Sequence, residues 1–485
     1  MPETRNISDR FTAARRALAE VGQEHVLHFY DDLDAAGRER LLQQVEAIDW
    51  AQIGRLIESH VLRTPQEGVP AQIEPAPWYP NVAPANLAPK YAEARRHGEQ
   101  LVRDGRVAAF TVAGGQGTRL GSDQPKGMYP ATPLRRLPLF RCLAEFIRKI
   151  QTKYRSVVPW YVMTSPVNDG DTRRYFEQQQ CFGLDPGNVM IFPQGMMPAF
   201  DPPSGRALLA TPDSLALSPN GHGGSLRALG ESGALEDMKR RGIEQISYTQ
   251  VDNPIVRVVD PLFIGLHAAD DCQMSSKAVA KTDPEEKVGV LCLVNGKIGV
   301  IEYSDLPAEL AGQRGEDGRL RFAAGSIAIH VIRRDFAETV NASGDAGLPV
   351  HRALKKVNHL DLDSGKTVSP SEPNAVKLEM FVFDGLGLCD RSIVYETDRI
   401  DEFAPIKNAD APNLDDSVDS PGTSRAIQIE RAGRWLEARG VRLPRDGGGT
   451  IGAEIEIGAL TAIEPDDLEG VALPERVEPG GQLLL

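Results

Sequence analysis

Apolar runs of strand length alternate with helical patterns through the middle of this 485-residue chain. Strand-like runs such as VAAFTVAGG, VPWYVMTS, NVMIFP, EQISYTQVDN and GSIAIHVI are separated by amphipathic stretches such as LFRCLAEFIRKIQ and LRALGESGALEDMKRRG. This alternation predicts an α/β fold whose mostly parallel sheet is covered by helices on both faces. Because ligands of such sheets bind beyond the carboxyl ends of the strands, the loops at those ends are where a functional site is expected.

Two segments precede the α/β region. Residues 1–64 carry apolar side chains at helical spacing, among them Leu41, Val45 and Ile48, and are predicted to form an N-terminal helical part. Residues 65–90 are rich in proline and show neither helical nor strand periodicity, so they predict an extended linker.

The α/β region is predicted to span residues 91–407, and a smaller unit follows it. Residues 408–485 begin with a polar, Pro- and Asp-containing stretch and continue into one helical pattern at residues 424–439. The alternation of apolar residues from Ile451 to Ile457 then has a period of two. We therefore expect a C-terminal part with a helix and β-strands.

Composition excludes several classes of function. The chain has 54 Lys plus Arg against 68 Asp plus Glu, a net charge of −14, so it gains no general attraction to nucleic acid or to anionic lipid. Five cysteines form no CxxC pair and indicate neither a disulfide framework nor a zinc site. Without an N-terminal apolar core or a long apolar run, the sequence predicts a cytoplasmic protein with no membrane segment.

The most informative local motif is AGGQGTRLGSDQPKG, residues 113–127, directly after the first strand-like run. Closely spaced glycines let the backbone approach a ligand, and the N–H groups of such a turn form a concavity for phosphate oxygens. A glycine-rich turn without a ligand is an equally good reading of the glycines alone. Arg119 and Lys126 add two spaced cations, a combination that suits a triphosphate.

Two familiar phosphate-binding motifs do not fit this loop. A Walker P-loop requires a lysine directly after its last glycine, whereas Gly117 is followed by Thr118. A dinucleotide fingerprint requires a third glycine where Leu120 stands, and an acidic residue about 20 positions further on. No Asp or Glu occurs between Gln124 and Ala144.

The motif resembles the signature of nucleotide-sugar pyrophosphorylases, and AGGQGTRLG with PKGMYP is similar to the eukaryotic-type UDP-N-acetylhexosamine pyrophosphorylases of the UDP-sugar pyrophosphorylase superfamily. Seven further segments, one before this motif and six after it, occur in the order of that family: GQEHVLHFYDDL, WYVMTS, FPQGMMPA, SPNGHGG, VDNPIVRVVDPLFIG, PNAVKLEMFVFD and DEFAPIKNAD. The resemblance implies a Rossmann-like uridylyltransferase domain. It also implies the reaction of UTP with a sugar 1-phosphate to give a UDP-sugar and pyrophosphate, with N-acetylglucosamine 1-phosphate as the preferred sugar.

The resemblance also implies roles for individual residues on the nucleotide side. Arg119 and Lys126 would neutralise charge on the departing pyrophosphate, although isolated surface cations more often pair with acids. The nucleotide itself would be bound by Ala113, Gly114, Gly115, Gly117, Thr118, Gln194, Gly221 and His222. Gln194 matches a uracil-recognising position, and His222 has the alternative of packing over the glycine turn.

Three further positions match the metal- and phosphate-binding residues of the family. Asp252, after a strand, matches an aspartate that binds Mg2+, although a lone Asp there is more often a cap or turn residue. Lys407 matches a lysine near the sugar phosphate and is the stronger catalytic candidate. Lys377 also matches a lysine near the substrates, but a surface charge explains it equally well.

Sugar recognition is implied for Gly289, Glu302, Ser326 and Lys377. A carboxylate such as Glu302 can accept hydrogen bonds from adjacent hydroxyls, while a solvent-facing strand residue is the alternative. The chain also departs from the family here, because FAAGSIAIH stands where FNAGNIANH is typical, and GHGG where GNGG is typical. These departures favour a second hypothesis, synthesis of UDP-glucose or of several UDP-sugars.

A third hypothesis is a non-catalytic UDP-sugar-binding protein that has kept the fold. The presence of Arg119, Lys126, Asp252 and Lys407 argues against it, since binding alone requires no clamp on the leaving group. The expected partners are UTP and a sugar 1-phosphate, with no nucleic acid and no membrane. The sequence identifies no protein partner.

Overall fold

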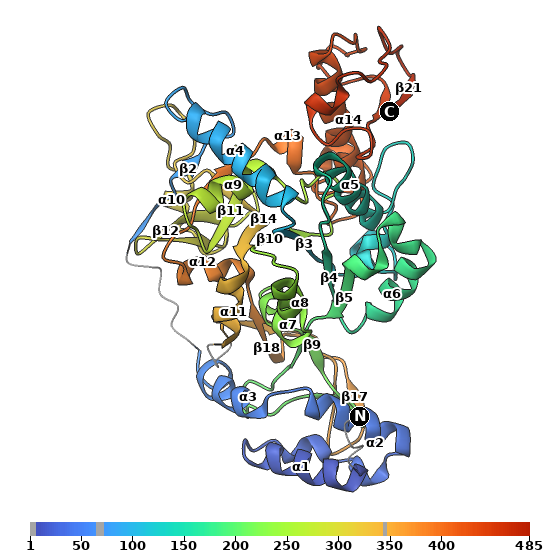
Figure 1. Ribbon diagram of the computed structural model, residues 1–485. Coiled ribbons are helices and arrows are strands. Elements are labelled where there is room, and N and C mark those ends of the chain that lie inside the picture. Colours follow the sequence, from blue (N-terminus) through green and yellow to red (C-terminus); the bar gives the residue numbers. More distant parts are fainter. Residues whose placement is uncertain (1–5, 65–71, 343–346) are drawn as a thin grey trace. The chain divides into compact units, whose positions relative to one another are not determined.

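The computed structural model describes residues 6–64, 72–342 and 347–485 (Figure 1). The contacts of the chain define two compact units, each discontinuous in sequence. The first unit comprises the described parts of residues 1–69, 194–227 and 340–384, and the second comprises those of residues 70–193, 228–339 and 385–485.

Helices occur along the whole described chain. The α-helices are α1 (Ile7–Ala19), α2 (Ala35–Glu46), α3 (Trp50–Leu56), α4 (Ala88–Arg103), α5 (Leu139–Tyr154), α6 (Asp169–Gln178), α7 (Gly224–Glu231), α8 (Ala234–Arg240), α9 (Pro261–Ala269), α10 (Ala308–Ala311), α11 (Arg334–Ala342), α12 (Gly385–Leu388), α13 (Arg399–Glu402) and α14 (Pro421–Ala438). The tighter 3-10 helices are η1 (Glu24–Leu27), η2 (Tyr30–Asp32), η4 (Thr118–Leu120), η5 (Lys126–Met128), η6 (Gln180–Gly183), η7 (Pro186–Asn188), η8 (Val382–Asp384), η9 (Leu414–Asp416) and η10 (Pro465–Leu468), and η3 (Ile57–Val61) is π-helical.

One 11-stranded sheet organises the second unit, and five two-stranded sheets complete the described strands. The large sheet contains β1 (Ile73–Pro75), β2 (Trp78–Tyr79), β3 (Val107–Val112), β4 (Trp160–Thr164), β5 (Val189–Pro193), β10 (Gln245–Gln250), β11 (Met274–Ala280), β12 (Val290–Val294), β13 (Lys297–Ile301), β14 (Ala324–Arg333) and β19 (Val394–Glu396). The pairs are β6 (Met196–Pro198) with β9 (Leu217–Pro219), β7 (Leu209–Thr211) with β8 (Ser214–Leu215), β15 (Val350–Lys355) with β18 (Ala375–Met380), β16 (His359–Leu360) with β17 (Thr367–Val368), and β20 (Glu454–Glu456) with β21 (Gln482–Leu484).

The principal strand order is β2-β19-β11-β14-β10-β3-β4-β5. Strands β10, β3, β4 and β5 are mutually parallel, whereas β14 runs antiparallel to both β10 and β11. The predicted α/β class with a mostly parallel sheet is confirmed. Since β10 and β3 are parallel neighbours, the loops that follow them emerge at the same edge of the sheet.

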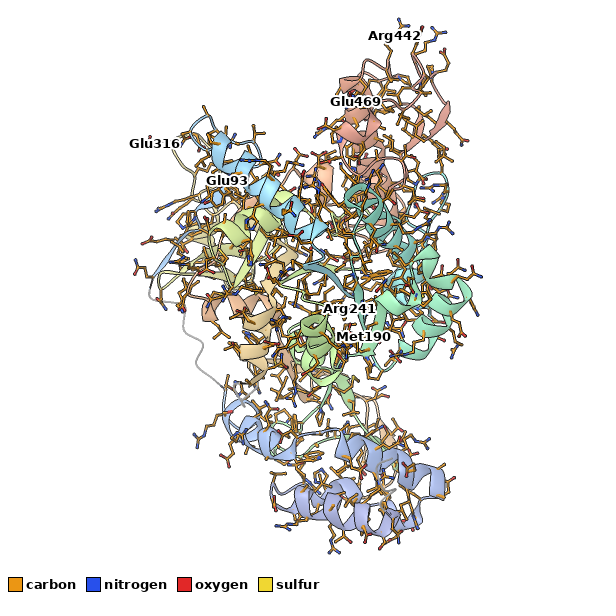
Figure 2. The ribbon with its side chains drawn as sticks, in the orientation of Figure 1. Glu93, Met190, Arg241, Glu316, Arg442 and Glu469 are labelled. Carbon is orange, nitrogen blue, oxygen red and sulfur yellow. The ribbon has the colours of Figure 1, made fainter. Side chains whose placement is uncertain are left out.

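Both faces of this sheet are covered, so the central strands bury their side chains on both sides. Val107 and Ala109 of β3 belong to the core that includes residues of α4, α5 and α9, whereas Phe110 packs against the Tyr248 ring on the opposite face. On that opposite face the Tyr161 hydroxyl of β4 donates to Asp237 of α8 at 2.6 Å. Near the same helix, Arg241 donates to the Gly187 carbonyl at 2.8 Å, beside the strand that carries Met190 (Figure 2).

Helices α4 and α9 pack with their backbones in contact (Figure 1). A Cβ atom at Gly98 would lie 1.7 Å from the Pro261 carbonyl oxygen, and one at Gly265 would lie 1.7 Å from the Ala94 oxygen. Only glycine fits at this crossing, because any side chain would overlap the backbone of the neighbouring helix.

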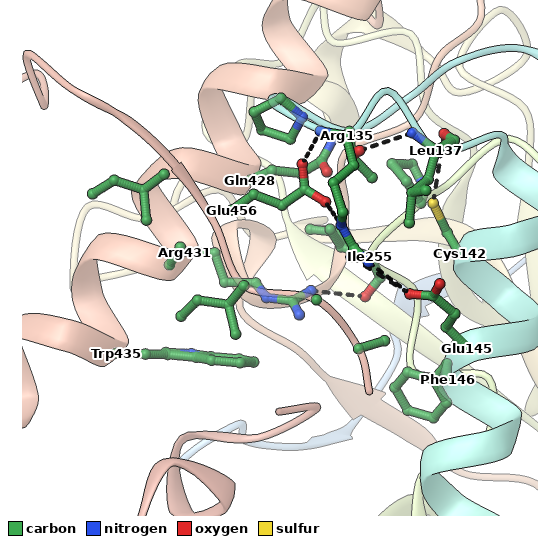
Figure 3. A pocket seen from close by; sticks show the side chains of 18 residues that line it. Arg135, Leu137, Cys142, Glu145, Phe146, Ile255, Gln428, Arg431, Trp435 and Glu456 are labelled. Carbon is green, nitrogen blue, oxygen red and sulfur yellow. Dashed lines mark hydrogen bonds and ion pairs between the residues drawn. The ribbon is translucent and has the colours of Figure 1, made fainter. Parts of the chain in front are cut away.

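The C-terminal residues of the second unit dock beside α5 through buried charges (Figure 3). Glu456 of β20 accepts hydrogen bonds from the backbone N–H groups of Leu134 and Arg135 at 2.8 Å, and from Arg135 Nε at 2.6 Å. A cavity of about 60 Å3 adjoins this contact, and the Arg431 guanidinium lies 4.5 Å from the Trp435 ring centroid beside it. The alternation predicted from Ile451 to Ile457 is confirmed by buried Ile451, Ala453 and Ile455, although the strand itself spans only Glu454–Glu456.

The first unit combines the N-terminal helices with short two-stranded sheets. Gln23 makes two hydrogen bonds to the 205–207 segment, donating to the Gly205 carbonyl at 3.0 Å and accepting from Ala207 N at 2.8 Å. Between α1 and α2 the chain forms the short helices η1 and η2. The described residues 6–64 thus contain helices, in several short pieces.

The predicted Pro-rich linker contains more regular structure than its composition indicates. Its residues 65–71 lie outside the described residues, while β1 and β2 join the large sheet by pairing with β12 and β19. Helix α4 begins at Ala88, inside the predicted linker. The boundaries predicted for the four segments stay predictions, since the two compact units follow a different, discontinuous division. Among the described residues, no helix has the length and apolar character that crossing a bilayer requires.

Candidate active site

The glycine loop leaves β3 and folds back on itself. Gly117 N donates to the Gln124 carbonyl at 3.0 Å and Lys126 N donates to the Gly115 carbonyl at 3.1 Å, which closes the loop at its base. Gly127 packs directly on a ring, because a Cβ atom there would lie 2.1 Å from Phe140. Ala113, Gly114, Gly115, Gly117 and Thr118, the backbone groups predicted to bind phosphate, all lie in this one loop.

Asn168 anchors the loop from the neighbouring strand connection and was not predicted from the sequence. Its side-chain amide donates to the carbonyls of Ala113 at 3.0 Å and Gly115 at 3.2 Å, and its Oδ1 accepts from Ser165 N at 2.8 Å. Asn168 is fully buried after β4. Its position between the end of a strand and the start of α6 is the signal by which it could have been found.

Lys126 and Asp252 lie together although they are far apart in sequence. Lys126 Nζ is 3.4 Å from Asp252 Oδ2, and the two side chains are only 16% and 12% exposed. Asp252 follows β10, and Val251 N donates to the Val112 carbonyl at the end of β3 at 3.1 Å. The parallel pairing of β10 with β3 therefore places the predicted metal-binding carboxylate beside the glycine loop.

Arg119 and Lys407 are the other predicted cations of this region. Arg119 is exposed on η4, and its side chain forms no ion pair with any carboxylate in the described parts of the chain. Lys407 Nζ lies 3.1 Å from Asp419 and remains 40% exposed. The segments that carry Arg119 and Lys407 are in contact, because Ala409 N donates to the Arg119 carbonyl at 3.2 Å. The Lys407 segment also contacts Asp252, whose carbonyl accepts from Ile406 N at 2.9 Å.

A cavity of about 190 Å3 lies beside these residues. Four predicted site residues line it together, namely Asp252, Gly289, Ser326 and Lys407. Ile327, Ile329 and Phe403 supply apolar surface to the same cavity. The structure therefore gathers the predicted metal, sugar and phosphate contacts of the second unit around one space.

The predicted sugar-binding residues of this unit adjoin one another. Ser326 N donates to the Gly289 carbonyl at 2.8 Å, and a Cβ atom at Gly289 would lie 3.5 Å from Glu302 Oε1. Strand β14 bulges next to Ser326, where its register with β11 shifts and Ala328 takes a positive φ of 54°. Such a bulge redirects side chains at the edge of a site.

The remaining predicted residues lie in the first unit, around the end of β18. A Cβ atom at Gly221, whose φ is +81°, would lie 2.4 Å from the Met380 carbonyl oxygen, so this turn requires glycine. Met380 N donates to the Asn220 carbonyl at 2.9 Å and fixes the turn. Gln194 is buried beside it, and Lys377 lies on β18 itself.

His222 packs among phenylalanine rings in this unit. Its ring centroid lies 5.3 Å from that of Phe381 and 5.5 Å from that of Phe383, and its Nδ1 accepts from Val382 N at 3.2 Å. Burial lowers the pKa of His222 to about 4, so the ring is neutral at physiological pH. His222 thus packs against aromatic rings, and its predicted role in nucleotide binding stays a prediction.

The residues present fit a single Mg2+ bound mainly by substrate. Asp252 Oδ1 accepts no hydrogen bond from any described residue, so it remains available to a cation. No group of three or more His, Cys, Asp or Glu residues in the described ranges has the arrangement of a metal site made by protein alone. Mg2+ commonly takes one or two carboxylates and completes its shell with water and phosphate oxygens.

A loop of backbone amides backed by cations and one carboxylate, at the carboxyl edge of this sheet, defines a nucleotidyltransferase. The comparisons with known proteins place the chain more narrowly. The family described as UTP–glucose-1-phosphate uridylyltransferase matches residues 70–414. The chain belongs to this family.

Similar curated proteins cover nearly the whole chain. The UDP-N-acetylhexosamine pyrophosphorylase-like protein 1 of Mus musculus is 35% identical over 94% of this chain and 93% of its own length. The UDP-N-acetylglucosamine pyrophosphorylase of Saccharomyces cerevisiae is 34% identical over 90% of this chain and 93% of its own length.

Solved structures agree with the fold. The uridine diphosphate N-acetylglucosamine pyrophosphorylase of Trypanosoma brucei, solved with an inhibitor, superposes with a TM-score of 0.83 at 23% identity, covering 99% of both chains. A putative UDP-N-acetylglucosamine pyrophosphorylase of Entamoeba histolytica gives a TM-score of 0.72 at 30% identity, covering 85% of this chain and 99% of the other.

Proposed function

We propose that this chain transfers a uridylyl group from UTP to a sugar 1-phosphate, giving a UDP-sugar and pyrophosphate, and that N-acetylglucosamine 1-phosphate is the preferred acceptor. The proposal fits the names of the relatives that cover most of the chain. The observation that carries it in this structure is the approach of Lys126 Nζ to Asp252 Oδ2, 3.4 Å apart beside the glycine loop.

The chemistry requires positioning and charge neutralisation. An oxygen of the sugar phosphate forms a bond to the α-phosphorus of UTP, the bond from that phosphorus to the bridging oxygen breaks, and pyrophosphate leaves with the electron pair. Backbone N–H groups of Gly114, Gly115 and Thr118 bind the phosphates. Those of Ala113 and Gly117 are already used, because they donate to the Met163 and Gln124 carbonyls. Lys126 and Arg119 offset the charge that develops on the leaving pyrophosphate.

Lys407 orients the sugar phosphate in this proposal. Its ammonium is bound to Asp419 but is 40% exposed, so exchanging that carboxylate for a phosphate costs little. Because Lys407 and Asp252 line the same cavity, the acceptor phosphate and the nucleotide phosphates meet there. Gly289 and Ser326, which line the same cavity, contact the sugar, together with Glu302, which lies next to Gly289.

Asp252 would hold the Mg2+ that we expect with the nucleotide. The bound ion would supply neutralisation of phosphate charge, and the protein would contribute one carboxylate oxygen to it. In the protein alone the nearby Lys126 ammonium balances this carboxylate. Because this ion pair is long, the Lys126 ammonium could turn toward a phosphate of the nucleotide.

Pyrophosphate release tests the proposal and separates its alternatives. The purified protein is incubated with UTP, Mg2+ and either N-acetylglucosamine 1-phosphate or glucose 1-phosphate. We expect release with both or with the first alone, and faster release with the N-acetylated sugar. Faster release with glucose 1-phosphate would replace the proposed acceptor, and no release with any sugar phosphate would favour a binding protein.

Two expectations from the sequence stay predictions. A dependence on Mg2+ is checked by repeating the release assay with excess chelator and then restoring the ion. A cytoplasmic location is checked by fractionating cells that produce the tagged protein.

A further inference from the structure

A larger cavity in the second unit lies outside the proposed active site. It encloses about 910 Å3, within the range of pockets that bind small molecules. Its lining comes from the β1–β2 segment, the end of β11, the start of β14 and the hairpin before β14. Glu316, labelled in Figure 2, belongs to that hairpin. We call this cavity the arginine pocket, and none of Lys126, Asp252 and Lys407 lines it.

Four cations line the arginine pocket, namely Lys281, Arg314, Arg319 and Arg321, against two acids, Asp317 and Glu396. Arg319 approaches Asp317 only at 3.9 Å. Arg314 donates to the Gly318 carbonyl at 2.8 Å and Arg321 donates to Gln313 Oε1 at 3.3 Å. Neither Arg314 nor Arg321 forms an ion pair with a carboxylate of the described residues.

Among the described residues, Arg314 and Arg321 have no carboxylate partner, although the chain as a whole has a net negative charge. With 68 acidic residues against 54 basic ones, most arginines have a carboxylate within reach, yet positive charge accumulates at this cavity. Planar guanidinium groups match phosphate oxygens in two-pronged hydrogen bonds.

Lys281 is the buried member of the set. The residue is only 5% exposed, and its ammonium donates to the Pro284 carbonyl at the long distance of 3.4 Å. No carboxylate in the described chain lies within ion-pair distance of it. Burial lowers the pKa of Lys281, as expected for a charge removed from water without a close counter-ion. An anion entering the cavity would supply that counter-ion.

The rest of the lining offers contacts for more than phosphate. The aromatic residue Trp78 and the apolar residues Leu320 and Phe322 also line the cavity. Glu396 already accepts a hydrogen bond from Asn81 N at 3.0 Å and retains acceptor capacity for hydroxyl groups. A ligand that combines phosphates, hydroxyls and a planar ring satisfies all three kinds of lining.

We propose that the arginine pocket is a second ligand site, separate from the active site, that binds a nucleotide through Lys281, Arg314 and Arg321 with its base against Trp78. The loop from residue 281 to 289 connects the two sites, since Lys281 and Thr282 line the arginine pocket while Val288 and Gly289 line the active-site cavity. The site is therefore placed to communicate with the sugar-binding residues.

Isothermal titration with ATP, whose base differs from that of the proposed substrate, tests the site without relying on turnover. We expect one ATP to bind, and the double variant Arg314→Ala, Arg321→Ala to lose at least about tenfold in affinity, because it removes two charge-assisted contacts to phosphate. The matched control is Lys126→Met, which removes a cation of the active site and should leave ATP binding unchanged.

Two further variants test the roles of the buried Lys281 and of the Trp78 ring. Lys281→Met should weaken the binding of ATP and of inorganic pyrophosphate alike, whereas Trp78→Ala should weaken ATP alone. ATP binding that is lost in Lys126→Met but kept in the arginine double variant would overturn the proposal, as would the absence of any ATP binding. Equal loss of ATP and pyrophosphate in Trp78→Ala would overturn the assignment of the base. Because every readout is binding, failure here is distinct from failure to release pyrophosphate in the catalytic assay.

Discussion

Lys126 and Asp252 form a loose pair, and in the proposed function both contact substrate. Their separation of 3.4 Å in a largely buried setting is longer than a strong charge-assisted hydrogen bond. Separating this pair costs less free energy than breaking a short buried ion pair would. Each side chain can therefore turn toward a phosphate or a cation.

The first prediction concerns Lys126. Lys126→Met should lower kcat for pyrophosphate release by about 100-fold, because it removes one preorganised charge from the transition state. The thermal midpoint should stay within about 2 °C of the unaltered protein. Lys356→Met, at an exposed position directly after β15 in the first unit, serves as the control and should leave kcat unchanged. A normal kcat in Lys126→Met would refute the leaving-group role.

Lys277 shows a different use of charge, because it is fully buried behind the active-site segments. Its ammonium donates to Asp260 Oδ2 at 2.7 Å and to both oxygens of Glu402 at 2.7 and 2.6 Å. Burial alone would raise the pKa of the Asp260 carboxyl, but the charges of Lys277 and Arg257 hold it well below its usual range. Asn253, next to Asp252, donates to the Glu402 carbonyl at 2.6 Å, which ties this cluster to the active site.

The second prediction is that Lys277→Met is strongly destabilising. Removing one partner leaves buried carboxylates uncompensated, a loss of about 3–5 kcal/mol in the free energy of unfolding. Adding Glu402→Gln should recover part of that loss, since one of the stranded charges is then removed. Urea unfolding measures both variants. If Lys277→Met alone unfolds at the same urea concentration as the unaltered protein, the buried cluster does not stabilise the fold.

At the scale of elements, the glycine loop depends on close packing as much as on backbone freedom. Gly127, at the start of the chain that leaves the loop, lies against the fully buried ring of Phe140 on α5. Gly121 has a positive φ of 72°, with open space around it. Glycine thus serves two different purposes in this short segment: it leaves room for the Phe140 ring at position 127 and adopts a left-handed conformation at position 121.

The third prediction contrasts these two glycines. Gly127→Ala should destabilise the protein by about 1–3 kcal/mol through overpacking, and should lower activity because Lys126 is the adjacent residue. Gly121→Asn should change stability little, since asparagine tolerates the left-handed region. Thermal melts and pyrophosphate release check both variants. Equal melting temperatures for the two variants would contradict the packing argument.

At the scale of the whole molecule, buried histidines make stability depend on pH. Burial lowers the pKa of His267 from its ordinary 6.5 to about 3, and Nδ1 of the ring lies 2.8 Å from Ser275 Oγ. His222 in the other unit is shifted the same way. A group whose pKa is lower in the folded state binds protons first in the unfolded state, so folding loses free energy as the pH falls.

The fourth prediction follows from that sign. The melting temperature should be independent of His267 above about pH 6.5 and should fall as the pH is lowered from there toward about 3. His267→Gln should melt with a shallower dependence on pH than the unaltered protein. His97→Gln, at an exposed position on α4, is the control and should not alter the slope. An identical slope in His267→Gln would refute the linkage.

Much of the architecture could be predicted because it has local causes. The buried runs at β3, β4, β5 and β10 carry strand length and apolar character in their own residues, and the glycine loop carries its turn chemistry in its own spacing. The predicted linker was less accurate. Short strands such as β1 and β2 gain their stability from pairing with β12 and β19. A segment of two or three residues carries too little pattern to identify a partner that is distant in the sequence.

The amino-acid sequence by itself determined the α/β class, the position of the glycine loop and the residue types around it, because period, glycine spacing and charge are properties of neighbouring residues. Only the tertiary structure decided that Lys126 meets Asp252, that His222 lies among phenylalanine rings and that three arginines line one large cavity. These features depend on burial and on pairing between distant segments. Their free energies arise only when the sheet has brought those segments together.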